Sequence, residues 1–221
     1  MTLILAVTNS KEIVVGADSL VYEGSGEVYR TYSTPKLRTI NAGRWIIGFS
    51  GLANTASMVW DYLEAIKQTF NPDIRIGAFE CVKRMGEFYR DNRLNLRDCR
   101  ALLAGFSESR PKIYSWSVEH PNPDGGDMRP WGAIGCGGDL ALHFARNCQP
   151  LEDLSTEQLS ALAHFSIAEI AKSDNRVEKP IDLGIVTPET AHIEDRDSVN
   201  QRFERKSEIL SGLISGQIRK L

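Results

Sequence analysis

The chain has 221 residues, 42% of them hydrophobic and 25% charged, a composition that excludes a disordered or fibrous protein. Its 26 basic and 29 acidic residues give a net charge of −3 without long runs of one sign, so neither a nucleic-acid partner nor a polybasic membrane tether is expected. We expect one domain over residues 1–221, because a single core extends to roughly 250 residues before it divides.

The cysteines and the first residues bear on metal content and compartment. The four cysteines show no short paired spacing, so neither a zinc site nor a disulfide framework is expected; they are Cys81, Cys99, Cys136 and Cys148. Charged residues interrupt the first stretch of the chain, which argues against a signal peptide. No apolar run reaches the about 20 residues of a membrane-spanning helix. We therefore expect a cytoplasmic protein without a metal ion.

Two β-hairpins are predicted near the start of the chain. The runs that form them are residues 3–7 with 13–17, and residues 36–40 with 45–49. Unbroken apolar runs bounded by turn residues are typical of strands that are covered on both faces. Gly43 lies in the second turn, as hairpin turns favour. No strand is predicted for the polar stretch 22–34 between the hairpins.

The rest of the chain alternates between groups of helices and groups of strands. Helices are predicted over residues 52–70, 76–93, 140–148, 156–170 and 199–221, and strands over 99–106, 112–118, around 133, 181–187 and 190–193. Ser155 and Gln158 form a capping-box signature before the fourth helix. Runs of strands separated by pairs of helices predict an α+β fold with antiparallel sheets, one packed against the other, and helices outside.

The hairpin geometry brings a hydroxyl and a carboxylate together. If the first hairpin turns symmetrically about Ser10, Thr2 lies opposite Asp18, and opposed residues lie about 5 Å apart at Cβ. The second hairpin sets Lys36 opposite Phe49, with Gly51 just beyond the strand. If the two hairpins pair edge to edge, Thr2, Asp18, Lys36 and Gly51 collect at one rim.

This set of residues fits amide hydrolysis once Met1 is removed. A threonine hydroxyl needs a base, and its own α-amine has a pKa of about 7.7 to 8.0, near the working pH. The Lys36 ammonium would hold the pKa of that amine down, and Asp18 would neutralise and orient the lysine. The backbone N–H of Gly51 would stabilise an oxyanion.

At these residues the chain resembles the β-type subunits of the proteasome, within the N-terminal-nucleophile hydrolases. The resemblance rests on "TLILAVTNSKEIVVGAD", "TPKLRTI", "GFSGLANTASMV", "GAIGCGGDLAL" and "SDNRVEKPIDLGIVT", in family order. It implies a four-layer αββα sandwich of two antiparallel sheets flanked by helices. It also implies catalytic roles for Thr2 as nucleophile, for Asp18, Lys36 and Gly51, and for Asp174 as a later aspartate near the nucleophile.

The chain departs from the family at positions near the implied site. Cys136 and Val177 stand where the family has serines that help hold the α-amine and its water. Ser19 replaces an arginine that usually follows the first aspartate, and the segment from Asp18 to Lys36 is slightly longer. Cys136 remains part of the candidate site through its place in the glycine-rich turn.

The resemblance implies a threonine peptidase that cleaves peptides or unfolded chains through an acyl-enzyme, inside a ring or double ring of identical subunits and without a cofactor. It also allows an energy-dependent unfolding partner. Two alternatives remain open: an amidase for a small substrate, and a ring scaffold without activity. For Asp174, a structural role at the end of a helix is an equally good interpretation. Phe49 is interpreted either as a residue that lines the substrate pocket or as part of the apolar core.

Overall fold

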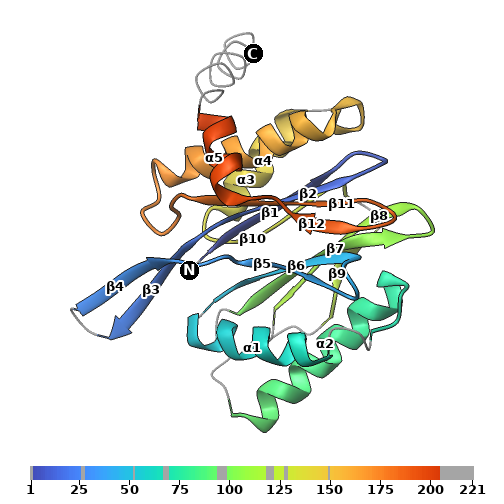
Figure 1. Cartoon of the computed structure of the whole chain (residues 1–221), viewed down its shortest axis with the longest axis vertical. Helices are drawn as coiled ribbons and strands as arrows, with labels where there is room; N and C mark the ends of the chain where they lie inside the picture. Colours follow the sequence, from blue (N-terminus) through green and yellow to red (C-terminus); the bar gives the residue numbers. More distant parts are fainter. Residues whose placement is uncertain are drawn as a thin grey trace.

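The computed structural model describes residues 2–25, 28–51, 53–66, 70–93, 99–117, 122–126, 129–148 and 150–204. Two antiparallel sheets lie face to face in the middle of the molecule, and helices cover both outer faces (Figure 1). The expected αββα layering is therefore confirmed.

The first sheet has the strand order β10, β1, β2, β11, β12. These strands are Trp131–Gly135 (β10), Leu3–Thr8 (β1), Ile13–Asp18 (β2), Ile181–Val186 (β11) and Ala191–Ile193 (β12). The second sheet has the order β5, β6, β7, β8, β9. Its strands are Leu37–Ile40 (β5), Trp45–Ser50 (β6), Arg100–Ser107 (β7), Arg110–Ser117 (β8) and Asp124–Gly126 (β9). The expected hairpins β1–β2 and β5–β6 both form.

The two hairpins do not pair edge to edge, so the arrangement considered from the sequence does not occur. β1 and β2 belong to the first sheet, whereas β5 and β6 belong to the second. Every residue of β1, β2 and β6 is buried, because each strand has a sheet on one face and helices on the other. The candidate residues of the two hairpins are consequently brought together across the space between the sheets.

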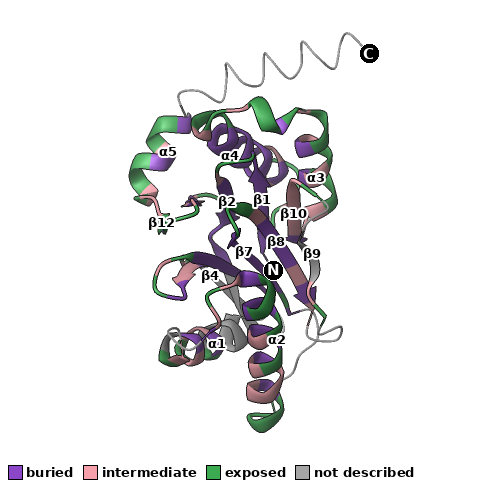
Figure 2. Cartoon of the chain, turned by 90° about the vertical axis from the view of Figure 1, so that its right-hand side faces the viewer, coloured by how far each residue is buried: buried purple, intermediate pink, exposed green. Residues whose placement is uncertain are grey.

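Helices cover each sheet on one side only. Those over the first sheet are Gly138–Asn147 (α3), Thr156–Ala171 (α4) and Arg196–Glu204 (α5), and those over the second are Ala53–Ile66 (α1) and Ile74–Asp91 (α2). A short 3-10 helix, Leu151–Asp153, precedes α4. Figure 2 shows buried strands between the two helical layers, whose outer surfaces are exposed. Among the described residues, no helix combines the length and the apolar character that crossing a membrane requires.

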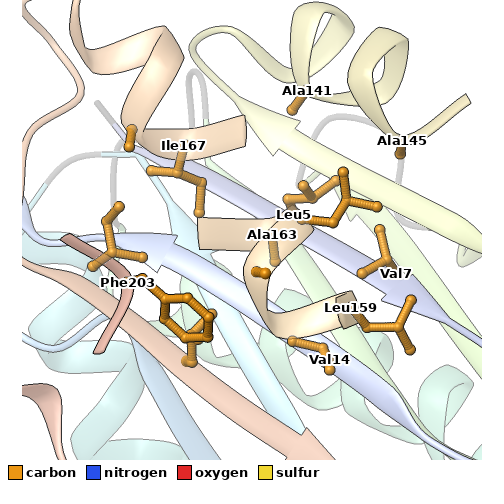
Figure 3. Packing of buried hydrophobic residues seen from close by; sticks show 14 of the residues in the cluster. Leu5, Val7, Val14, Ala141, Ala145, Leu159, Ala163, Ile167 and Phe203 are labelled. Carbon is orange, nitrogen blue, oxygen red and sulfur yellow. The ribbon is translucent and has the colours of Figure 1, made fainter. Parts of the chain in front are cut away.

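Three apolar cores hold the layers together. One lies between the sheets and contains Ile4, Val15 and Ile46. A second packs α1 and α2 onto the second sheet. The third packs α3 and α4 onto β1 and β2, with Leu5, Val14, Leu159, Ala163 and Ile167 among its members (Figure 3). Residues of β1 alternate between the inter-sheet core and the core under α4, as the period of a strand requires.

The starts of helices α4 and α5 can be compared with the sequence-based predictions. The Ser155 hydroxyl accepts the N–H of Gln158 at 3.3 Å, and Oε1 of Gln158 accepts the N–H of Ser155 at 2.8 Å, so the predicted capping box is confirmed. Helix α5 begins at Arg196, three residues before the expected start. The expected continuation over residues 205–221 lies outside the described residues.

The register of β1 against β2 differs by one residue from the expected one. Ile4 pairs with Ala17 and Thr8 pairs with Ile13, so Leu3, rather than Thr2, comes opposite Asp18. The turn explains the difference. Oδ1 of Asn9 accepts the N–H groups of both Lys11 and Glu12, which closes a four-residue turn in place of one centred on Ser10.

A hairpin fills the segment between Asp18 and Lys36. Leu20–Ser25 (β3) and Val28–Ser33 (β4) form a separate two-stranded sheet that extends away from the sandwich (Figure 1). These strands were not predicted from the sequence, because the segment is rich in polar residues and glycines. The N–H of Thr34 donates to the carbonyl oxygen of Ser19 at 3.0 Å and closes the base of the hairpin.

Candidate active site

Thr2 lies at the start of β1, between the two sheets, and is 4% exposed. Its carbonyl oxygen accepts the backbone N–H of Cys136 at 2.9 Å, from the turn between β10 and α3. The same oxygen accepts the hydroxyl of Ser50 at 3.3 Å, from the end of β6. Both sheets therefore fix the backbone of residue 2.

Gly135 makes the close approach to Thr2 possible. Its φ is +90°, in the region that L side chains rarely adopt. A Cβ atom at this position would lie 1.6 Å from the carbonyl oxygen of Thr2, well inside contact distance. The glycine-rich turn that the sequence displays at residues 135–139 thus has a specific steric role beside Thr2.

The carboxylate of Asp18, at the end of β2, is fully buried and joins three groups. Oδ1 accepts the backbone N–H of Leu3 at 2.7 Å. Oδ2 accepts the N–H of Leu20 at 3.2 Å and binds Nζ of Lys36 at 3.0 Å. Asp18 therefore connects the residue after Thr2 directly to the buried lysine, as the sequence led us to expect, although through a different register.

Lys36 precedes β5 and is 5% exposed. Its ammonium also donates to the carbonyl oxygen of Leu20 at 2.5 Å. Burial lowers the pKa of Lys36, against the opposing attraction of Asp18. Burial likewise raises the pKa of Asp18, against the attraction of Lys36 and the hydrogen bond from Leu3. Desolvation thus brings this ion pair closer to its neutral form than an exposed pair would be.

Gly51 follows the last residue of β6, as expected, with a φ of +146° that favours glycine. Phe49 pairs with Ala101 of β7 and meets the ring of Trp60 edge-on, with the ring centroids 4.7 Å apart. It belongs to the core between the second sheet and α1 and α2. Of the two interpretations of Phe49 in the sequence, the core residue is the one that fits.

Asp174 lies in the turn after α4, where its N–H donates to the carbonyl oxygen of Ile170 at 2.8 Å. Both of its carboxylate oxygens bind the guanidinium of Arg176 at 2.7 Å. These hydrogen bonds hold the pKa of the Asp174 carboxyl below its usual value. Within the described part of the chain, its side-chain partner is Arg176, and no described contact joins it to Thr2.

Cys136 and Val177 both contact the apolar core under α4. Val177 is fully buried and Cys136 is half-buried. The described contact between Cys136 and Thr2 uses the backbone N–H of Cys136, so it does not depend on the thiol.

Two cavities border the glycine-rich turn. The larger has a volume of about 750 Å³ and is lined by Gly137, Ile170, Asp174 and Arg176 among others. The smaller, of about 160 Å³, includes Arg100 of β7 together with Gly135 in its lining. Space for a ligand is thus available next to the turn that binds residue 2.

Sequence reasoning missed four residues of this region, namely Ser50, Gly135, Asp182 and Arg196. Gly135 was visible only as a turn residue, and Ser50 only as the neighbour of Gly51. Asp182 binds Arg196 and the backbone N–H of Lys36, and no local sequence pattern predicts these contacts. In the described residues, His, Cys, Asp and Glu side chains form no group of three that could hold a metal ion.

The arrangement is suited to activating a group at residue 2. A buried ammonium and carboxylate lie next to the start of β1, and the backbone of Thr2 is held by two hydrogen bonds. Low dielectric strengthens electrostatic effects at such a site.

Known proteins resemble this chain in sequence and in structure. The family described as "Proteasome subunit" matches residues 2–186. The chain is 27% identical, over 160 residues, to the ATP-dependent protease subunit HslV of Bacillus cereus (strain B4264). That alignment covers 72% of this chain and 82% of the relative.

Solved structures show the same fold. The Anbu (Gly-1) mutant from Hyphomicrobium sp. strain MC1 superposes with a TM-score of 0.78 at 16% identity, covering 100% of this chain and 98% of the other. A structure titled as the helical assembly of the Anbu complex from Pseudomonas aeruginosa gives a TM-score of 0.77 at 16% identity, covering 99% and 96%.

Proposed function

The chain belongs to the proteasome subunit family, and we propose that it is a threonine peptidase whose nucleophile is the hydroxyl of Thr2 after removal of Met1. The proposed substrates are peptides or unfolded chains. Residues 1–221 would act as one domain, with Asp18, Lys36 and Gly51 as further catalytic residues.

The observation that supports this proposal best is that Asp18 binds two groups at once. One carboxylate oxygen binds the N–H of Leu3, and the other binds Nζ of Lys36. The lysine is thereby tied to the residue that follows the nucleophile. Cys136 and Ser50 hold the carbonyl oxygen of Thr2, which restricts the position of the residue whose hydroxyl would attack.

The chemistry follows from these positions. The α-amine of Thr2 takes the proton from the Thr2 hydroxyl as its oxygen attacks the substrate carbonyl. The ammonium of Lys36 favours the neutral form of that amine and stabilises the developing negative charge on the oxygen. The amine then gives its proton to the leaving nitrogen of the substrate, which leaves an ester between Thr2 and the acyl fragment. Water hydrolyses this ester and restores the hydroxyl.

Backbone and cavity groups complete the proposed site. The N–H of Gly51, at the end of β6, would bind the oxyanion of the tetrahedral intermediate. The two cavities that border the glycine-rich turn would accept parts of the substrate chain. Asp174 would support the site from the larger cavity, with Arg176 holding its carboxylate ionised.

We extend the proposal to assembly. A homo-oligomer is proposed because the related protein from Pseudomonas aeruginosa is described as a helical assembly. An ATP-driven partner is proposed because the Bacillus cereus relative is named an ATP-dependent protease subunit.

Peptide hydrolysis tests the proposal. The protein should hydrolyse acyl-peptides that carry a fluorophore in an amide bond at their C-terminus, and the rate of fluorophore release measures this activity. Thr2→Ala should lower that rate by about 10³-fold or more because it removes the nucleophile. Thr2→Ser, which keeps a hydroxyl, is the matched control and should retain measurable activity. Equal rates for the parent and Thr2→Ala would contradict the proposal.

A second candidate is a structural subunit without hydrolytic activity. It is favoured by the apolar surroundings of Cys136 and Val177, where the family resemblance leads us to expect serines. An assembled protein that shows no Thr2-dependent hydrolysis of any peptide in the panel would support this candidate.

A further inference from the structure

Asp182 is a buried carboxylate on β11, 3% exposed. Its partner in the neighbouring strand is Ala17, a member of the core between the sheets, so Asp182 also faces the space between the sheets. A charge in such a place needs a partner, because desolvation of an isolated carboxylate costs several kcal/mol.

Arg196, the first residue of α5, supplies that partner. Its Nε binds Oδ1 of Asp182 at 2.6 Å, and its Nη2 binds Oδ2 at 3.0 Å. This two-pronged contact fixes the plane of the carboxylate. The remaining Nη1 donates to the hydroxyl of Ser33 at 2.9 Å, and that hydroxyl donates to Oγ of Ser19 at 2.8 Å. Arg196 therefore joins α5 to the base of the β3–β4 hairpin.

The carboxylate of Asp182 also binds the backbone of Lys36. Oδ2 accepts the N–H of Lys36 at 3.2 Å. Lys36 follows Pro35, which has no N–H, and precedes β5, at the edge of the second sheet. The contact thus links the first sheet to the backbone from which the Lys36 side chain extends toward Asp18.

We propose that Asp182, with its carboxylate oriented by Arg196, is a positioning residue that fixes the backbone of Lys36 and so the place of its ammonium beside Asp18. The inference rests on the proposed function, in which Lys36 acts on the α-amine of Thr2. It makes the first residue of α5 part of the support for the active site.

The charge of Asp182 gives this role a measurable signature. Among the charged or titratable groups that act on Lys36 are Asp18 from β2, Asp182 from β11 and Cys136 from the turn before α3. The negative charge of Asp182 opposes the lowering of the Lys36 pKa by burial. Its removal should therefore move the alkaline limit of activity to lower pH.

The test compares Asp182→Asn and Arg196→Lys with the parent in the peptide assay. Asp182→Asn keeps the shape of the side chain but puts an amide donor against the donors of Arg196 and Lys36. Arg196→Lys keeps the positive charge and loses the two-pronged contact. The matched control is Arg202→Gln, on the same helix, which breaks the more exposed ion pair of Arg202 with Glu194.

We expect Asp182→Asn to lower kcat by about 10- to 100-fold with a smaller change in KM, because misplacement of a catalytic group impairs the reaction more than binding. Its alkaline limit should move to lower pH. Arg196→Lys should lower kcat with the pH limit less changed, since the charge of Asp182 remains. Arg202→Gln should stay within about twofold of the parent.

The outcomes separate the two proposals. A parent protein without Thr2-dependent hydrolysis would contradict the proposed function. An active parent, with Asp182→Asn matching Arg202→Gln in kcat and in pH profile, would overturn the positioning role alone. Circular dichroism and sedimentation establish that each variant folds and assembles. If Asp182→Asn does not fold, Arg196→Lys is compared with Arg202→Gln. A lower kcat for Arg196→Lys would support the positioning role, and an equal kcat would overturn it.

Discussion

The backbone N–H of Leu3 donates a 2.7 Å hydrogen bond to Oδ1 of Asp18. The other oxygen of this carboxylate binds Lys36 at 3.0 Å, so one buried side chain holds both the start of β1 and the lysine. Stability and the proposed catalysis therefore depend on the same contact. A change at Asp18 should affect both.

We expect Asp18→Asn to lower the free energy of unfolding by about 3 kcal/mol, because it leaves the buried ammonium of Lys36 without its counter-ion. Urea denaturation at pH 7 and a fixed protein concentration measures the change. Glu169→Gln is the control, since Glu169 pairs with Lys172 on the surface and such pairs contribute about 1 kcal/mol or less. Equal effects of the two substitutions would show that the Asp18 pair is not a significant source of stability.

Gly135→Ala should displace Thr2 and abolish hydrolysis, because the new Cβ would lie 1.6 Å from the Thr2 carbonyl oxygen. It should also lower the thermal midpoint. Gly86→Ala in α2 is the matched control, because its Cβ would meet no atom within 4 Å. Alanine should stabilise that helix by about 0.5 to 1 kcal/mol. An active Gly135→Ala protein would contradict the fixed placement of Thr2.

The pH dependence of kcat/KM should be bell-shaped. In the proposed mechanism the α-amine of Thr2 must be neutral, so activity should be lost as pH falls through the pKa of that amine, which the proposed role of Lys36 places below the usual value of about 7.7 to 8.0. Lys36 must be charged, so activity is present below its pKa and lost as pH rises through it. Burial lowers that pKa, which places the alkaline limit below about 10.4, the usual value for lysine.

Lys112→Met provides the control for this profile. Lys112, on β8, is also buried with a lowered pKa, but it interacts electrostatically with Asp73 and Arg75, away from Asp18. Its substitution should leave both limits of the profile in place. Lys36 would not be the group that sets the alkaline limit if Lys112→Met shifted this limit, or if the limit lay at or above the usual pKa of lysine.

The layers of the fold could be predicted because they depend on local periodicity. Apolar runs such as residues 3–7 and 13–17 identified strands covered on both faces, and Ser155 with Gln158 identified the start of α4. The polar β3–β4 hairpin was missed because its sequence displays no apolar face. Whether β1–β2 and β5–β6 pair edge to edge could not be predicted, because sequence does not distinguish neighbours in one sheet from neighbours across two.

Sequence predicted the ion pair of the candidate site but not the contacts around it. Asp18 does pair with Lys36, yet the N–H groups of Lys11 and Glu12 donate hydrogen bonds to Oδ1 of Asn9, and this turn shifts the register so that Asp18 meets Leu3, the residue after Thr2. Asp182 and its contact with the backbone of Lys36 could not be found in the same way. Such a contact depends on the distance between two sheets, which no spacing in the sequence encodes.

The most direct measurement is the intact mass of the purified protein before and after exposure to a peptide epoxyketone, an electrophile that reacts with an N-terminal threonine. We predict that Met1 is absent and that a single adduct forms and maps to Thr2, with no adduct on Thr2→Ala. A protein that retains Met1, or one that lacks Met1 and forms no adduct at Thr2, would contradict the assignment of Thr2 as the nucleophile.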